Sequence, residues 1–223
     1  MATAKPFLRW AGSKRKQICR LRQFWRGNHV RYVEPFAGSA CLFFAIQPTT
    51  ALLADKNSQL IEAYEIIRES PEDVYDRVAC LPRTERVYYA QRSRDPQHLT
   101  PIDRAIRFVY LNRNCFNGIY RTNGQGMFNV PFATSRAGAF VSRGEFVAAA
   151  QALNHAVLRP WDFGKTLRYV TKGDFVYLDP PYAVTSRRVF KEYGATPFCV
   201  SDLSRLAEHL KKINARCPCG KRV

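Results

Sequence analysis

The sequence predicts an α/β protein, a doubly wound sheet of parallel strands with a mostly helical insertion. Two strand-to-helix units near the N-terminus support this fold, at residues 31–46 and 51–69. A run of helical patterns then suspends the alternation, and strand patterns return only later. With 223 residues, the chain is long enough to bury one large core. We therefore expect one sheet-based domain from residues 1–70 and 141–223, interrupted by an insertion over 71–140.

The first two units share one design, in which a strand leads through a tight turn into a helix. Arg31–Glu34 is a β-rich run that ends at a proline, and the apolar pattern of Ser39–Ile46 predicts a helix. Ala51–Ala54 is apolar throughout, which indicates a buried strand. In the helix that follows, Asn57 is the expected cap, and apolar residues recur at helical spacing up to Glu69.

The insertion begins with helices and ends with turns. Residues 71–114 carry helical patterns throughout, most clearly Pro101–Asn114, whose apolar residues share one face. Residues 115–134 are rich in Asn, Gly and aromatic residues, which predicts turns and a hairpin. We place this hairpin at residues 114–132.

The last third of the chain returns to the sheet. Ser142–Asn154 has a helical pattern, and Ala156–Arg159 and Asp174–Leu178 are the third and fourth expected strands. The fourth strand is apolar enough to be covered on both faces. Ser201–Asn214 is the last expected helix.

The charge balance favours a polyanionic partner. The formal net charge is +17, from 35 Lys and Arg against 18 Asp and Glu. Residues 1–33 contain nine basic residues and no acidic one, and residues 111–144 contain four arginines and no acidic residue. A solvated surface normally mixes the two signs, so nucleic acid is the leading partner, with a merely basic surface as the alternative.

The composition also bears on where the protein is located and on whether it binds a metal. The apolar runs fall far below the roughly 20 residues that cross a bilayer, and the basic N-terminus lacks the apolar region of a secretory signal. Seven cysteines, an odd number, suit a reducing cytoplasm. Cys217 and Cys219 with His209 match no zinc-site spacing, so we expect no metal and no membrane.

The clearest motif is Asp179-Pro180-Pro181-Tyr182, directly after the fourth expected strand. Two prolines remove backbone donors and fix φ, so the chain leaves the sheet in a rigid loop where open α/β folds bind ligands. A carboxylate and an aromatic ring there suit a flat heterocycle with an exocyclic amine. Asp179 would accept its N–H hydrogen bonds, and Tyr182 would stack on the ring. The competing interpretation is a proline turn with a capping Asp.

Three further segments favour a nucleoside-bearing cofactor. The segment 34–39, Glu-Pro-Phe-Ala-Gly-Ser, lies between the first strand and the first helix, although its single glycine is weak evidence for a phosphate cradle. Asp55 ends the next strand about twenty residues on, at the spacing from which an acid reaches ribose hydroxyls. It would serve equally well as an acid at a helix N-terminus. Phe7–Lys14 places Trp10 before a small-residue turn, where it binds a ligand or simply anchors the chain.

These segments together resemble the Dam-type DNA adenine-N6 methyltransferases, the D12 class with alpha-type motif order. The resemblance spans about residues 5 to 215 and rests on Phe7–Lys14, Val33–Ser39, Asp55, Leu111–Phe132 and Asp179–Tyr182. It implies a Rossmann-like methyltransferase sheet with a mostly helical DNA-recognition insertion. It also implies methyl transfer from S-adenosyl-L-methionine to a flipped adenine in a short palindrome, with GATC as the expected site. Family members often have a second glycine where this chain has Ser13.

Site residues follow from the same resemblance. The implied cofactor-binding residues are Trp10, Lys14, Phe36, Gly38, Asp55, Asp162, Phe163 and Asp179. The implied catalytic residues are Asp179, Pro180 and Tyr182. The implied DNA-binding residues are Arg9, Phe116, Asn117, Ile119, Arg121 and Arg136. An apolar wedge helps to extrude a base and arginine pairs with guanine, so the hairpin residues suit double-stranded DNA.

Other functions remain open at this point. A cytosine-N4 methyltransferase typically has Ser, and a protein-glutamine methyltransferase Asn, where this chain has Asp179. A protein that binds DNA without turnover, a catalytically impaired remnant of such an enzyme, would keep the basic surfaces.

The resemblance also sets an expectation for the C-terminus. A sheet of this family would continue after the last helix with a fifth strand and a closing hairpin, for which eight residues containing Pro218 and Gly220 are too few. We therefore expect a truncated chain that leaves the strand at Phe175–Leu178 on an exposed edge. We expect it to be a monomer of low solubility, with weak or absent activity.

Overall fold

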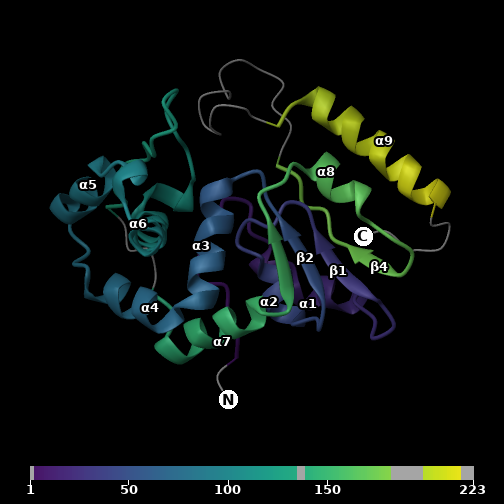
Figure 1. The fold of residues 1–223 in the computed structure, drawn as a ribbon, viewed down its shortest axis with the longest axis horizontal. Coiled ribbons are helices and arrows are strands. Elements are labelled where there is room, and N and C mark those ends of the chain that lie inside the picture. The colour runs from purple at the N-terminus through teal and green to yellow at the C-terminus, as the bar shows by residue number, and fades with distance from the viewer. Residues whose placement is uncertain (1–2, 135–138, 182–197, 217–223) are drawn as a thin grey trace.

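The fold is a parallel sheet between layers of helices, which confirms the predicted α/β class. The structure is a computed structural model that describes residues 3–134, 139–181 and 198–216. Within these residues the sheet has four strands in the order β3-β2-β1-β4 (Figure 1). They are β1 Arg31–Glu34, β2 Ala51–Ala54, β3 Ala156–Arg159 and β4 Asp174–Val176. All pairings are parallel, and Val33 in β1 lies opposite both Leu52 and Val176.

The strand predictions are confirmed at the level of single residues, with one correction. β4 ends at Val176, two residues earlier than expected. The backbone N–H of Tyr177 still donates to the carbonyl of Val33 at 2.9 Å, so the chain stays beside β1 as it leaves the sheet. Among the described residues, β4 is the end strand of the sheet.

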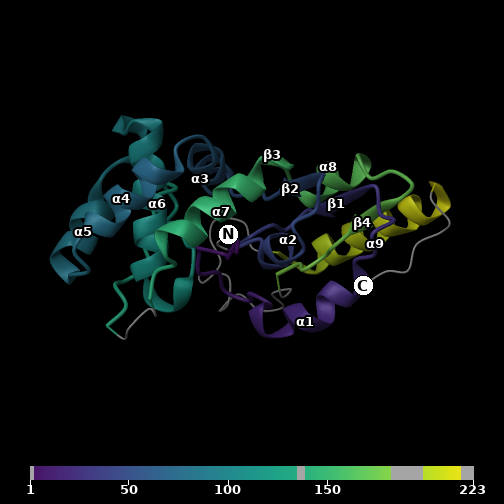
Figure 2. The same cartoon turned by 90° about the horizontal axis from the view of Figure 1, so that it is seen from below.

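Helices cover both faces of the sheet. Tyr32, Leu53 and Phe175 point to the face that is packed by α2 (Cys41–Ile46), α3 (Ser58–Glu69) and α7 (Arg143–Leu153). Val33 and Leu52 point to the opposite face, where α8 (Phe163–Arg168) and α9 (Val200–Arg216) pack. Figure 2 shows the sheet between α8 and the N-terminal α1 (Ile18–Leu21). This three-layer arrangement leaves the carboxyl ends of the strands open to a ligand.

A group of helices lies beside the sheet. They are α4 (Pro71–Cys80), α5 (Glu85–Ser93) and α6 (Pro101–Asn114), and α6 packs against α3 (Figure 1). The chain then folds back on itself through two isolated antiparallel bridges, Cys115 with Phe132 and Thr122 with Phe128. A third apolar cluster, which includes Tyr88, Tyr110 and Phe128, anchors this return segment to α5 and α6.

Sequence patterns placed the long helices well and missed the short ones. Asn57 caps α3 by accepting from the backbone N–H of Leu60 at 3.2 Å, as expected. α2 begins at Cys41 rather than Ser39, because Gly38 and Ala40 have positive φ values of 47° and 48° and cannot belong to a helix. α8 and the segment 15–24 were not predicted. The latter is a string of short turns, Arg15–Gln17, α1 and Arg22–Phe24, without a side-chain cap.

None of the helices in the described ranges combines the length and the apolar character that crossing a bilayer requires.

Candidate active site

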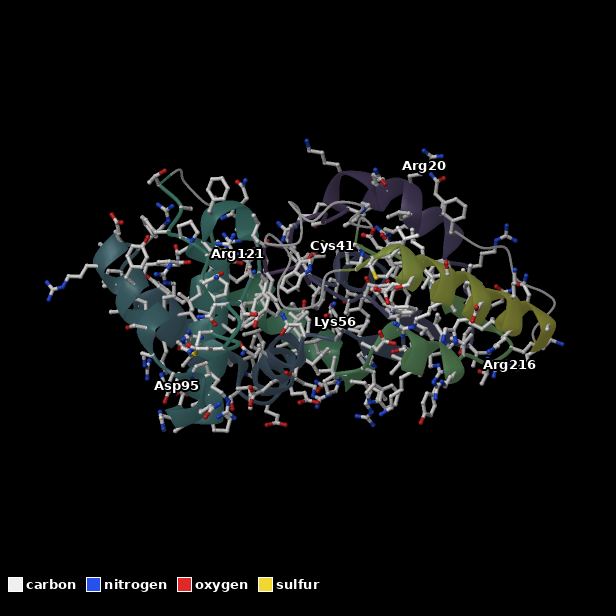
Figure 3. All side chains as sticks on the ribbon, turned by 90° about the horizontal axis from the view of Figure 1, so that it is seen from above. Arg20, Cys41, Lys56, Asp95, Arg121 and Arg216 are labelled. Atoms are coloured by element: carbon white, nitrogen blue, oxygen red, sulfur yellow. The ribbon has the colours of Figure 1, made fainter. Side chains whose placement is uncertain are left out.

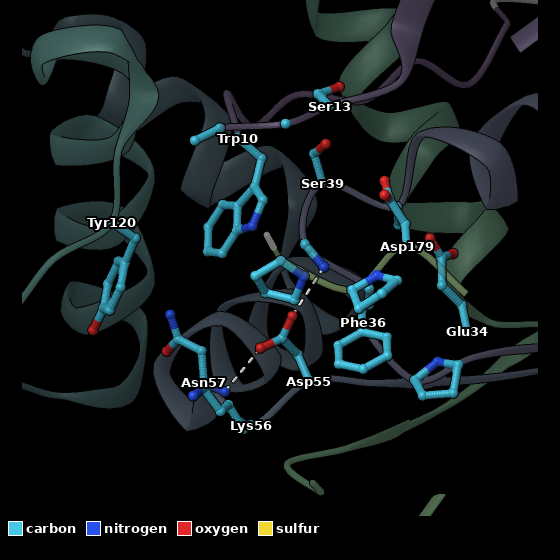
Figure 4. A pocket seen from close by; sticks show the side chains of 18 of the residues that line it. Trp10, Ser13, Glu34, Phe36, Ser39, Asp55, Lys56, Asn57, Tyr120 and Asp179 are labelled. Atoms are coloured by element: carbon cyan, nitrogen blue, oxygen red, sulfur yellow. Dashed lines mark hydrogen bonds between the residues drawn. The ribbon is translucent and has the colours of Figure 1, made fainter. Parts of the chain in front are cut away.

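A cavity of about 530 Å³ lies at the carboxyl ends of β1, β2 and β4. Its volume falls within the range of about 300–1,000 Å³ that is common for small-molecule sites. One wall, the strand-end side, consists of Phe36–Gly38, Asp55 and Asp179–Pro181. The facing wall, the hairpin side, is formed by residues of the segment 119–126. Figure 4 shows Tyr120 of the hairpin side across the cavity from Asp179.

The cavity brings together most of the residues that the sequence singled out. Those that line it are Trp10, Lys14, Phe36, Gly38, Asp55, Ile119, Asp162, Phe163, Asp179 and Pro180. They come from segments more than 160 residues apart in the chain, such as Lys14 and Asp179. Tyr182 and Arg136 lie outside the described residues.

The loop after β1 has a backbone that only glycine fits at one point. Gly38 has φ +47°, and a Cβ placed there would lie 2.7 Å from the Trp10 ring. The Tyr64 hydroxyl donates to the Gly38 carbonyl at 2.7 Å from below. The loop is therefore packed between an indole and a phenol, and it forms part of the cavity lining.

Asp55 fixes the same loop from the end of β2. Its two carboxylate oxygens accept the backbone N–H groups of Gly38 at 3.0 Å and Asn57 at 2.9 Å (Figure 4). Removal from water raises the pKa of Asp55, and these two hydrogen bonds oppose the rise. Each oxygen keeps a further lone pair, so Asp55 can hold the loop and also accept a hydroxyl. The structural and ligand-binding interpretations of Asp55 are thus compatible.

Asp179 faces the cavity and is paired with a lysine. The Lys14 ammonium donates to Asp179 Oδ1 at 2.6 Å and to the Gly12 carbonyl at 2.9 Å. Both side chains of the pair are about a quarter exposed, so water screens the pair only in part. Tyr177 lies alongside, and burial together with the charge of Asp179 raises the pKa of its phenol well above its ordinary value.

Glu34 is a buried acid in the cavity wall that the sequence reasoning did not select. It is 3 % exposed and accepts a hydrogen bond from the Tyr32 hydroxyl at 2.8 Å. Burial raises its pKa well above the ordinary value, and the charges of Asp179 and Asp55 add to the rise. The sequence feature that could have identified Glu34 is its position, because it is an acid at the last residue of a strand.

Aromatic rings form the remaining walls. Phe36 and Phe163 are stacked with their centroids 5.4 Å apart, and Phe198 meets Phe36 edge-on at 5.9 Å. On the other side, the rings of Trp10 and Tyr120 are nearly parallel with centroids 6.1 Å apart. Flat apolar walls of this kind suit an aromatic ligand ring.

The structure places Arg9 at the base of the hairpin rather than free in solvent. Its guanidinium donates to the carbonyls of Arg113 and Cys115 at 3.4 and 3.2 Å. Its backbone N–H and carbonyl are both bonded to the Asn112 side chain, at 2.8 and 2.6 Å. The N-terminal segment that carries Trp10 is thereby attached to the start of the hairpin.

The other hairpin residues differ in exposure. Phe116 is 50 % exposed, and Asn117 beside it has φ +50°, a conformation that asparagine tolerates. Ile119 faces the cavity. Arg121 donates through Nε to Asn129 Oδ1 at 2.8 Å, which holds the guanidinium along the hairpin.

Within the described ranges, no cluster of three or more His, Cys, Asp or Glu side chains could hold a metal ion. Of the residues considered above for zinc, Cys217 and Cys219 lie outside those ranges.

Comparison with known proteins gives a consistent picture. A family model described as D12 class N6 adenine-specific DNA methyltransferase matches residues 10–219. The type II methyltransferase M1.LlaDCHI of Lactococcus lactis subsp. cremoris is 30% identical over 95% of this chain and 78% of its own length. The DNA adenine methylase of Haemophilus influenzae is 31% identical over 94% of this chain and 75% of its own length. The DNA adenine methylase of Serratia marcescens is 31% identical over 98% of this chain and 83% of its own length.

Proposed function

The chain belongs to the D12 class N6 adenine-specific DNA methyltransferases, and we propose that it methylates the N6 atom of an adenine flipped out of a short DNA palindrome. We propose GATC as the palindrome and S-adenosyl-L-methionine as the methyl donor. The observation that carries this proposal is the single cavity that Asp179-Pro180-Pro181 shares with the glycine loop at Gly38. A group that orients an amine and a loop that fits a nucleoside thus face the same space.

The residues of the strand-end side fit this methyl donor. Gly38 lets the Trp10 ring pack directly on the loop, because a side chain there would collide with it, and both residues line the cavity. Asp55 retains acceptor capacity for ribose hydroxyls, and Phe36 and Phe163 offer an apolar wall for the adenine ring. When bound, S-adenosyl-L-methionine supplies an electrophilic methyl group.

The part of this chain in the reaction is to position the amine. Asp179 would accept the N6 hydrogens together with the Pro180 carbonyl, and Tyr182 would stack on the flipped base. A carboxylate is far too weak a base to deprotonate an aromatic amine beforehand. Its contribution is to orient N6 and to stabilise the positive charge that develops on nitrogen. The Lys14 ammonium, 2.6 Å away, holds the Asp179 carboxylate at the cavity.

The hairpin side is proposed as the part that recognises DNA, within an insertion over 71–140. Ile119, Tyr120 and Thr122 line the cavity, so a base that entered it would pass beside them. In Figure 3, Arg121 of the hairpin side and Arg20 of α1 lie on either side of Cys41, which lines the cavity. Such a distribution suits phosphate contacts on both sides of a flipped base.

Transfer of labelled methyl groups tests this function. The chain is incubated with labelled S-adenosyl-L-methionine and a GATC duplex, and the nucleosides are separated after digestion. The expected product is N6-methyl-2′-deoxyadenosine, with protection of GATC from a methylation-sensitive restriction enzyme. DNA binding without any labelled nucleoside would refute the proposed activity, and label on N4 of cytosine would refute the proposed acceptor.

A further inference from the structure

One arginine on α9 links that helix to the cavity wall without lining the cavity itself. Arg205 donates through one terminal nitrogen to Asp202 Oδ1 and through the other to Asp162 Oδ1, both at 2.7 Å. Asp162 and Asp202 both line the cavity. The arginine therefore bridges two acids of one wall, 40 residues apart in the chain.

This guanidinium lies over an aromatic ring of the cavity wall. Its central carbon lies 4.7 Å from the centroid of the Phe163 ring, the ring that stacks on Phe36 in the cavity. A Cβ at Gly164 would lie 3.2 Å from the arginine and 2.9 Å from Asp162 Oδ1, so glycine leaves the room for this approach. The planar guanidinium of arginine can bond both acids while it lies over the ring, and the ammonium of lysine cannot do so.

The two carboxylate oxygens of Asp162 differ in their hydrogen bonds. Oδ1 accepts from the backbone N–H of Gly164 at 2.8 Å and from Arg205, which uses its two lone pairs. Within the described residues, no donor is bonded to Oδ2. Two donors thus hold Oδ1, and Oδ2 is left to accept a hydrogen bond from a ligand.

We propose that Arg205 is a positioning residue that makes the cofactor pocket specific for adenine. By occupying Oδ1 and stacking on Phe163, it turns Oδ2 toward the exocyclic amine of the bound adenosyl group. A purine with a carbonyl at that position would set an oxygen against the carboxylate and lose the hydrogen bond. This inference rests on the proposed function, since it concerns the same cofactor.

The exposure of the bridge separates this role from a purely structural one. The Arg205 side chain is 48 % exposed and that of Asp162 is 43 % exposed. Ion pairs this exposed contribute little to folding stability. Loss of Arg205 should therefore change ligand discrimination far more than it changes the unfolding temperature.

The test compares two ligands that differ at one position of the purine, S-adenosyl-L-homocysteine and its deaminated analogue S-inosyl-L-homocysteine. Their dissociation constants are measured by calorimetry for wild type, Arg205→Ala, Arg205→Lys and the control Lys211→Ala. Lys211 is exposed on the same helix and outside the cavity lining. Thermal unfolding of each variant is recorded alongside.

We expect wild type and Lys211→Ala to prefer the adenosyl compound strongly. Arg205→Ala should reduce this preference by about tenfold, mainly through weaker binding of the adenosyl compound, and Arg205→Lys should fall between. Equal weakening of both ligands, with an unchanged ratio, would overturn the inference and leave the proposed function intact. Should Arg205→Ala fail to fold, the ratio in Arg205→Lys decides in the same way. Wild type that binds neither compound would overturn the proposed function and this inference together.

Discussion

The two walls of the cavity are held together in different ways. On the strand-end side, hydrogen bonds join separate segments: Gly38 to Asp55 and Lys14 to Asp179. On the hairpin side, Tyr120 packs on the rings of Trp10 and Phe108, but the hydrogen bonds of residues 121–129 are local. Asn123 Oδ1 accepts the backbone N–H groups of Gln125 and Met127, both at 3.0 Å.

The two walls should therefore differ in how well they tolerate substitutions. The geometry around Asp179 depends on the whole α/β fold, whereas the hairpin can change its tip residues without disturbing the sheet. Local bonds and isolated bridges also make the hairpin the easier part to deform when a ligand binds. We therefore expect the strand-end side to hold the reacting groups rigidly and the hairpin side to adapt to the DNA that it recognises.

The largest effect is expected at Asp179. Asp179→Ala should abolish methyl transfer, because the remaining Pro180 carbonyl accepts only one of the two N6 hydrogens and carries no charge to stabilise the developing cation. Affinity for DNA should stay within a few fold, because phosphate contacts from basic residues supply most of the binding. Filter binding and labelled methyl transfer on the same preparations measure the two quantities. Substantial turnover in this variant would remove Asp179 from the mechanism.

The comparison is sharpest in a pair of glycine substitutions, one in the cavity wall at the strand ends and one in the hairpin segment 119–126. In Gly38→Ala the new Cβ would lie 2.7 Å from the Trp10 ring at a φ of +47°, so we expect at least tenfold weaker cofactor binding. In Gly124→Ala the new Cβ meets nothing within 4 Å, so we expect little change. Calorimetric titration with S-adenosyl-L-homocysteine measures both. Similar losses in the two variants would contradict the proposed division of the cavity.

A third prediction concerns sequence readout on the hairpin side. Arg121→Ala should cost about 1 to 3 kcal/mol at one guanine and relax the choice of base there. Lys16→Ala, from the exposed N-terminal segment, should weaken all sequences alike and reduce the salt dependence. Binding to cognate and scrambled duplexes over a range of salt concentrations distinguishes them. Equal losses on both duplexes for Arg121→Ala would refute its role in readout.

The smallest effect is expected from Glu34, through the pH dependence of stability. Its pKa is raised in the folded state, so the folded chain binds the proton more tightly than the unfolded chain. Stability from this group is therefore present below pH 4.5 and is lost as the pH rises toward the folded pKa. Each tenfold difference in proton affinity between the folded and unfolded chains corresponds to about 1.4 kcal/mol. Glu34→Gln should be more stable than wild type at pH 8 and not at pH 4, as measured by denaturant unfolding. A stability difference independent of pH would contradict a pKa of Glu34 that burial raises.

Features that depend on a single strand, helix or loop could be predicted from the sequence. The strands, the Asn57 cap and the Asp-Pro-Pro loop depend on patterns within a few residues, and the structure has them close to the expected places. Contacts that join distant segments could not be foreseen. The bonds of Arg9 to the start of the hairpin span 103 to 106 residues, and the bond of Arg205 to Asp162 spans 43 residues. Glu34 was passed over because burial, which gives it its altered pKa, is a property of the folded chain.

The most direct test of the division between the two walls is a map of methylated bases on plasmid DNA treated with wild type and with Arg121→Ala. The account predicts N6-methyladenine at one palindrome for wild type. For the variant it predicts the same modified atom at an enlarged set of related sites. The hairpin side would then set where methylation occurs, and the strand-end side which atom is methylated. A variant that modifies a different atom, or one that keeps the wild-type site list at full rate, would contradict this account.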